Sequence, residues 1–179
     1  MVNDKMVNIF MFYKLIRYNQ VGNAVYGKLF RTSHYYNLRT GQTTERLHFI
    51  CDTLENADHL ILPLIYPVTV TMSPKFKRLL PVIIQVPGFN DTRVIGAPNT
   101  NQRSVCGGES GGNDALYVAK RHPLASFAER GGIRIHRGTR PEHSRGCILV
   151  SPENEAALTA RFRAEQSANE ETRLEICDR

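Results

Sequence analysis

The feature that most restricts the fold of this chain is a series of short segments rich in β-branched and aromatic residues, separated by turn residues. The segments that predict strands are residues 25–30, 47–55, 66–72, 81–86, 132–136, 147–150 and 173–177. In one of them, Val68, Val70 and Met72 alternate with threonines, as expected of a strand that buries one face. This pattern predicts a mainly β fold.

One segment, residues 152–166, carries the signals of a helix instead. Ser151 stands where an N-cap is expected, and Pro152 occupies the favoured first helical position. Leu158 and Phe162 are four residues apart, so they share the face that packs on the sheet. The expected fold is therefore a β-sandwich or partly closed barrel with one C-terminal helix.

Residues 92–131 lack a strand pattern and contain four closely spaced glycines, which is typical of a binding loop or a surface insertion. A short helix within residues 114–129 is interrupted by Pro123. The chain has 179 residues, a length that suits one hydrophobic core. We expect a single domain, residues 1–179, in which 92–131 is a loop insertion.

The net charge of +6 is unevenly distributed along the chain. Residues 1–50 carry seven Lys or Arg against two Asp or Glu, and residues 130–150 carry five against one. This excess favours an anionic partner, such as a carboxylate-bearing peptide, a polymer or nucleic acid, unless it is only a solvated basic face. Nucleic acid is the least favoured partner, because the aromatic content is 8%, Trp is absent and no nucleic-acid-binding motif is present.

The N-terminal segment contains a short apolar run that is broken by Lys14 and lacks a small-residue cleavage site. The run is too short to cross a bilayer, so we expect no membrane span. We also expect no classical signal peptide. The prediction is cytoplasmic synthesis, with delivery to the periplasm or cell wall by a non-classical route if the protein acts there.

Reactive side chains concentrate in residues 131–150, GGIRIHRGTRPEHSRGCILV. Strand alternation places the two isoleucines of this segment toward the core, and Arg134 and His136 on the opposite face. Cys147 begins the next predicted strand. Two strands joined by such a loop can lie side by side, with the end of the first near the start of the second. We therefore expect His136 and Cys147 within hydrogen-bond reach.

A cysteine in this setting can serve as a nucleophile, because an imidazole can take its proton and nearby cations favour the thiolate. Arg137 and Arg145 are the candidate cations. Gly146 permits close backbone approach, so its N–H and that of Cys147 can face a developing oxyanion. Ser144 is a candidate hydrogen-bond partner within the loop.

Two other interpretations of Cys147 remain open. One is an inert buried thiol. The other is a zinc site formed with His136 and His143, although no fourth ligand has suitable spacing. We expect no metal and no cofactor. The four cysteines show no CxxC pair and no regular spacing, so free thiols are expected.

The motif IHRG…HSRGCI resembles the signature of the L,D-transpeptidase catalytic domain. This resemblance implies that Cys147 is the nucleophile, that His136 is the base and that the carbonyl of Arg137 orients the imidazole. Ser144, Arg145 and Gly146 would form the cysteine loop, and Arg134, Arg145 and His143 would bind substrate. The implied activity is acyl transfer on peptidoglycan stem peptides through a thioester. An L,D-carboxypeptidase would pass the acyl group to water, and a transpeptidase would pass it to an amine.

Two features depart from the L,D-transpeptidase pattern. The interval of eleven residues from His136 to Cys147 is shorter than usual, and Leu149 stands where that family has Arg or Asn. Arg134 is the candidate replacement for this substrate-binding residue. The departures keep open a second function, a non-catalytic phage structural or cell-wall-binding module that retains the fold.

Most of the chain also resembles an uncharacterised bacterial and phage domain family, and the expected lack of a classical signal peptide suggests a phage-borne or secreted-effector context. The shared blocks are CDTLE (51–55), YPVTVTMSPKFKRLLP (66–81), VPGF (86–89), GIRIHRG (132–138) and GCILV (146–150). In the first block, Asp52 and Glu55 fall on opposite faces of a strand. We expect a turn-capping Asp and a solvent-exposed Glu there, not a carboxylate pair.

Overall fold

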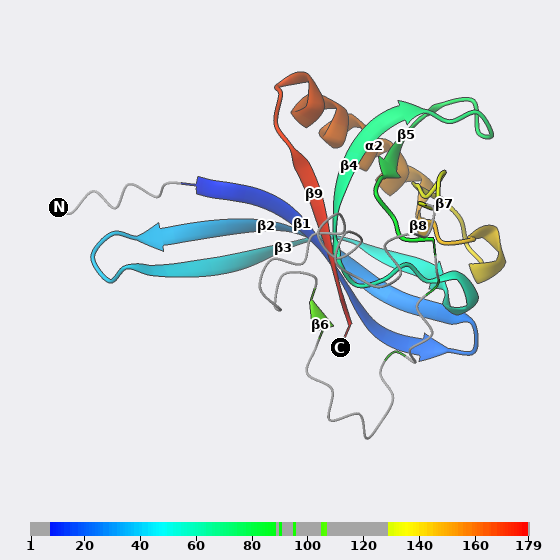
Figure 1. Cartoon of the computed structure of the whole chain (residues 1–179), viewed down its shortest axis with the longest axis horizontal. Helices are drawn as coiled ribbons and strands as arrows, with labels where there is room; N and C mark the ends of the chain where they lie inside the picture. The colour runs from blue at the N-terminus through cyan, green and yellow to red at the C-terminus, as the bar shows by residue number, and fades with distance from the viewer. Residues whose placement is uncertain (1–7, 89, 91–94, 96–104, 107–128, 179) are drawn as a thin grey trace.

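The computed structural model describes residues 8–88, 90, 95, 105–106 and 129–178. The described strands are β1 (Asn8–Val21), β2 (Ala24–Asn37), β3 (Gln42–Asn56), β4 (Ile65–Met72), β5 (Leu79–Ile83), β6 (Val105–Cys106), β7 (Ile135–Arg137), β8 (Ile148–Val150) and β9 (Thr172–Asp178). One α-helix, α2 (Pro152–Ser167), follows β8, and 3₁₀ turns occupy Ala57–His59 and Pro141–His143. The predicted mainly β fold with a C-terminal helix is confirmed (Figure 1).

The strands form one sheet in the order β5-β4-β9-β1-β2-β3-β8-β7, with β6 paired to β9. Its first and last strands approach each other, because an isolated bridge joins Val82 to Arg134 and the N–H of Ile83 donates to the carbonyl of Ile133 at 2.8 Å. The sheet is therefore a nearly closed barrel, and β5 and β7 face each other across its seam.

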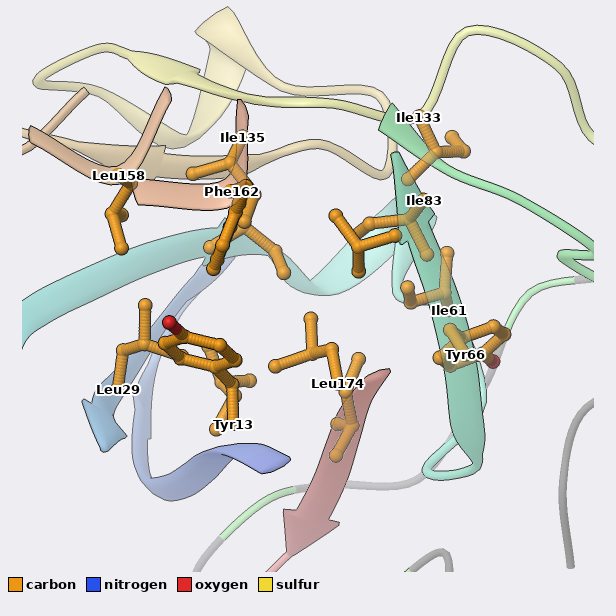
Figure 2. Packing of buried hydrophobic residues seen from close by; sticks show 14 of the residues in the cluster. Tyr13, Leu29, Ile61, Tyr66, Ile83, Ile133, Ile135, Leu158, Phe162 and Leu174 are labelled. Atoms are coloured by element: carbon orange, nitrogen blue, oxygen red, sulfur yellow. The ribbon is translucent and has the colours of Figure 1, made fainter. Parts of the chain in front are cut away.

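Helix α2 begins as its sequence predicts. The Ser151 hydroxyl accepts a hydrogen bond from the N–H of Asn154 at 3.2 Å, which caps the helix. Leu158 and Phe162 are buried, and the Phe162 ring packs edge-on against Tyr13 of β1 at 4.6 Å between centroids. Figure 2 shows these side chains pointing into the same core as residues of the sheet. The helix thus covers one face of the barrel.

The predicted alternation in residues 132–136 is confirmed for the isoleucines. Ile133 and Ile135 are 3% and 0% exposed and belong to the main core cluster (Figure 2). The strand itself is shorter than predicted and spans only Ile135–Arg137. Strand β7 begins at Ile135 because the residue before it, Arg134, forms an isolated bridge with Val82 of β5 and does not pair with β8.

Strand β1 was not predicted, although it lies inside the sheet between β9 and β2. Its Arg17 is fully buried and binds Glu55 through two hydrogen bonds, Nε to Oε2 at 2.9 Å and Nη2 to Oε1 at 2.8 Å. The expectation that Glu55 faces solvent is therefore wrong. β1 brings a buried cation beside it, and a buried carboxylate needs such a partner.

Most of the predicted 92–131 insertion, including the short helix at 114–129, lies outside the described residues. Within it, β6 pairs with β9, and Cys106 lies opposite Cys177 in the register. Cys177 is disulfide-bonded, while Cys51 and Cys147 are free. The expectation of free thiols is wrong for Cys177, because cross-strand register cannot be deduced from cysteine spacing.

Candidate functional site

Strands β7 and β8 are parallel, with Ile135 paired to Ile148 and His136 paired to Leu149. The expectation that the end of one strand meets the start of the other is therefore wrong. Because side chains alternate, Cys147 and His136 still lie on the same face of the pair, offset along the strands. The loop between them is long enough for the chain to return and run in the same direction.

The sulfur of Cys147 contacts the backbone that precedes β7. It accepts a hydrogen bond from the N–H of Arg134 at 3.4 Å and lies 3.6 Å from the carbonyl oxygen of Gly132. No hydrogen bond connects Cys147 to His136 in the part of the chain that the structure describes. The thiol therefore rests against main-chain groups and is not bonded to the imidazole.

His136 is held in one orientation by its neighbour. Its Nδ1 lies 2.8 Å from the carbonyl oxygen of Arg137, and since a carbonyl only accepts, Nδ1 carries the proton. This leaves the lone pair of Nε2 free to accept a proton. Burial lowers the pKa of His136, which is 3% exposed, so the imidazole is neutral near pH 7.

The turn between β4 and β5 covers the imidazole, and the sequence did not single it out. The ring of Phe76 lies 4.7 Å from the His136 ring, tilted by 38°. Lys75 Nζ and Arg78 Cζ lie 5.3 Å and 5.1 Å from the centroid of the same Phe76 ring. Both cations lower the pKa of His136 in addition to burial. The available signal was the YPVTVTMSPKFKRLLP block (66–81), which contains this turn but gives no role to Phe76.

Glu155, at the start of α2, ties the turn to β7. Its carboxylate accepts two hydrogen bonds from Arg78, both at 2.8 Å, and one from the N–H of Arg137 at 2.6 Å. The Arg137 guanidinium also contacts it at 3.3 Å. Burial opposes the charged form, but these hydrogen bonds hold the pKa of Glu155 below its ordinary value. Glu155 therefore remains an anion close to His136.

The cysteine loop is organised by Ser144. Its hydroxyl donates to the carbonyl of Cys147 at 2.6 Å and accepts from the N–H of Gly146 at 3.2 Å. The Asn56 side chain donates to the carbonyl of Ser144 at 3.2 Å and anchors the loop to β3. The N–H of Gly146, a candidate oxyanion donor, is thus engaged inside the loop. Gly146 has φ +109°, and a Cβ there would lie 2.5 Å from Arg130 Nη2.

Burial raises the pKa of Cys147 above its ordinary value, so the resting thiol is protonated. The N–H of Arg134 and the charges of Lys75 and Arg130 act in the opposite direction. These are not the cations that the sequence suggested. Arg137 is directed at Glu155, and the side chain of Arg145 is exposed.

Arg134 is buried, and its guanidinium donates to the ends of β4 and β5. The acceptors are the carbonyls of Thr71, Leu80 and Met72, at 3.2, 3.3 and 3.4 Å, and the hydroxyl of Thr71 at 3.0 Å. Both terminal nitrogens of the Arg134 guanidinium therefore already donate to main-chain and hydroxyl oxygens. The side chain thereby joins β7 to the opposite side of the barrel seam.

The other candidate substrate-binding residue, His143, is exposed in the loop, where its Nδ1 accepts from the N–H of Thr139 at 3.3 Å. Leu149 is 1% exposed and packs tightly on Gly138, where an added Cβ would lie 2.9 Å from Leu149 Cδ2. Leu149 is thus a core residue.

No protein-family model, curated protein or solved structure matches this chain. Within the described ranges, no three or more His, Cys, Asp or Glu side chains are grouped so that they could hold a metal ion. None of the described helices is long and apolar enough to cross a membrane.

Proposed function

We propose that this protein is a cysteine-dependent acyl-transfer enzyme of the L,D-transpeptidase or L,D-carboxypeptidase type, acting on peptidoglycan stem peptides. The observation that carries the proposal is the Nδ1 contact of His136 with the Arg137 carbonyl, which leaves Nε2 as a base on the face that also bears the free thiol of Cys147. The IHRG…HSRGCI motif and the nearly closed β-barrel support the same assignment.

In the proposed reaction, the thiol of Cys147 turns from Gly132 toward His136, and Nε2 takes its proton. The sulfur forms a bond to the carbonyl carbon of an L-configured stem residue. The bond from that carbon to the terminal D-amino acid breaks, and the departing amine receives the proton from His136. Water then hydrolyses the thioester to a carboxylate, or an amine converts it to a new peptide bond.

Lys75 is the cation we assign to the carboxylate of the substrate. Arg78 and Arg137 are bound to Glu155, and Arg134 is bound to main-chain oxygens. Lys75 is exposed, and its ammonium has no carboxylate partner in the part of the chain that the structure describes. Its charge lowers the pKa of both Cys147 and His136, which supports a role for Lys75 near the bond that the proposed reaction breaks.

Digestion of purified peptidoglycan, read by mass spectrometry of the muropeptides, tests the proposal. The wild type should convert stem peptides by loss of the terminal D-amino acid or by forming new cross-links. Cys147→Ala should leave them unchanged, and Cys51→Ala, which removes the other free thiol, should behave as wild type. A wild-type profile identical to untreated wall would reject the enzymatic function.

The alternative is a non-catalytic wall-binding module. It is favoured by the apolar, buried Leu149 and by the lack of a resting hydrogen bond between Cys147 and His136. Sedimentation with insoluble peptidoglycan distinguishes the two functions. A binding module would sediment equally as wild type and Cys147→Ala, with no change in the muropeptides of either sample.

A further inference from the structure

A second hollow lies on the long hairpin of β2 and β3, lined by residues other than those of the thiol site. It has a volume of about 600 Å³ and is lined by Arg31, Ser33, Tyr35, His48, Phe49, Ile50 and Arg161. We call this hollow the arginine cleft. Its lining contains hydroxyl, imidazole and guanidinium groups and the ring of Tyr35, and none of the lining residues carries a carboxylate. Phe49 lines the cleft, but its ring packs against Phe30 on the other face of the hairpin.

The hairpin and the helix form the arginine cleft together. Arg31 pairs with His48, and Ser33 pairs with Arg46, across the β2–β3 register, and directly paired residues share a face of a sheet. Arg161 comes from α2, which covers the core on the same side. Figure 1 shows the hairpin extending well beyond the rest of the sheet. The cleft is lined by residues of this hairpin and by Arg161 of the helix.

Positive charge gathers at the arginine cleft. Arg31 and Arg161 line the cleft, and Arg46 lies over the ring of the lining residue Tyr35, at 4.8 Å from its centroid. Glu45, the nearest acidic residue of the hairpin in sequence, is on the opposite face, bound to Lys14 at 2.6 Å. This grouping accounts for part of the basic excess of residues 1–50, which the thiol site does not use.

We propose that the arginine cleft binds a sugar phosphate, an activity separate from the thiol chemistry. Guanidinium groups bind phosphate oxygens with paired N–H donors, and groups from two elements can hold one doubly charged phosphate. The ring of Tyr35 offers apolar surface to a sugar ring, and the volume suits a small organic ligand. The same chemistry occurs in free sugar phosphates, in nucleotides and in repeat units of phosphorylated polymers.

Titration calorimetry with glucose 1-phosphate and with AMP tests this inference, with glucose as the unphosphorylated control. We expect saturable binding of a phosphorylated probe and none of glucose. Arg161→Gln and Arg46→Gln should each weaken binding at least tenfold. Arg163→Gln, an exposed arginine of the same helix outside the cleft, should bind as wild type. Thermal unfolding of each variant checks that it is folded.

Tighter binding of glucose 1-phosphate than of AMP would indicate a glycan source, and the reverse order would indicate a nucleotide. No binding by the wild type would overturn the proposal, as would equal loss in Arg161→Gln and Arg163→Gln. Binding of citrate as tightly as of the phosphates would overturn the phosphate assignment. Cys147→Ala should bind as wild type, which keeps this test independent of the acyl-transfer proposal.

Discussion

At the scale of single residues, the thiol and the imidazole rest as a neutral pair. Burial raises the pKa of Cys147 and lowers that of His136, and both shifts favour the uncharged forms. A preformed thiolate–imidazolium pair would require the opposite shifts. Proton transfer therefore belongs to the reaction step itself, with His136 as a general base, and does not precede substrate binding.

This arrangement predicts the pH dependence of kcat/KM for D-amino acid release. Protonated His136 cannot accept the thiol proton, so activity should rise with pH through a midpoint below 6.5, the ordinary value of histidine, and then level off. Lys75→Met removes a cation that lowers the pKa of His136, so the midpoint should move to higher pH while KM rises. Arg39→Met, at the hairpin tip, should leave the midpoint in place. An unmoved midpoint in Lys75→Met would contradict the assignment.

Gly146 gives a second residue-level prediction, for stability. An alanine there must adopt φ +109° with its Cβ 2.5 Å from Arg130 Nη2, so Gly146→Ala should lower the free energy of unfolding by about 1–3 kcal/mol. Gly131→Ala is the matched control, because nothing lies within 4 Å of its added Cβ. Urea unfolding of both variants measures the difference. Equal stabilities would show that the cysteine loop adapts to a side chain.

At the scale of elements, Glu155 connects α2, β7 and the β4–β5 turn. A hydrogen bond to a charged group typically contributes about 1.5–3 kcal/mol to the free energy of unfolding. Because Arg78 and Arg137 are partly exposed to solvent, we expect a contribution at the lower end of this range. Glu155→Gln should therefore lower the free energy of unfolding by about 1.5 kcal/mol at neutral pH. Glu153→Gln, exposed on the same turn of helix, should change it little.

The pH dependence of this loss has a definite sign. The pKa of Glu155 is depressed in the folded protein, so its stabilisation is complete above the unfolded value of 4.5 and disappears as pH falls through the folded value. The difference between wild type and Glu155→Gln should shrink accordingly in urea unfolding between pH 7 and pH 3. A constant difference would show that the carboxylate charge is not what stabilises the contact.

The strands and the helix could largely be predicted from sequence because their signals are local. Alternation identified β4, and the N-cap with Pro152 identified α2. Strand direction is not a local property, so the parallel pairing of β7 with β8 was missed. Strand β1 was missed because an arginine in its sequence, Arg17, suggested an exposed segment, although Arg17 is buried. The contact between Phe76 and His136 was missed because the two residues are distant in sequence and come together only in the folded protein.

At the scale of the whole molecule, the candidate site lies at the seam of the barrel. The bridge between Val82 and Arg134 brings the two ends of the sheet together, and the N–H of Ile148 donates to the carbonyl of Arg134 at 3.0 Å. Arg134 therefore links β4 and β5 to the strands that carry the thiol and the imidazole. Both the closure of the barrel and the geometry of the candidate site therefore depend on Arg134.

Arg134→Lys separates a role in the seam from a role in substrate binding. Lysine keeps the charge that a carboxylate would bind but lacks the planar fork that reaches several carbonyls. If Arg134 holds the seam, the variant should lose about 1–3 kcal/mol of stability. Amide exchange at Ile83, whose N–H bonds Ile133, and at Ile148 should accelerate at least tenfold, while Leu15 in β1 keeps its protection.

A role of Arg134 in substrate binding predicts a different result for Arg134→Lys. Unchanged exchange at Ile83 and Ile148 with a large rise in KM would place the Arg134 guanidinium on the substrate, as the candidate replacement for the residue that Leu149 displaces. Lys75→Met should show the opposite combination, with exchange at the seam unaltered and KM raised. Comparing the two variants in the same exchange and kinetic assays decides which cation meets the substrate carboxylate. The four oxygens around Arg134 in the structure favour Lys75.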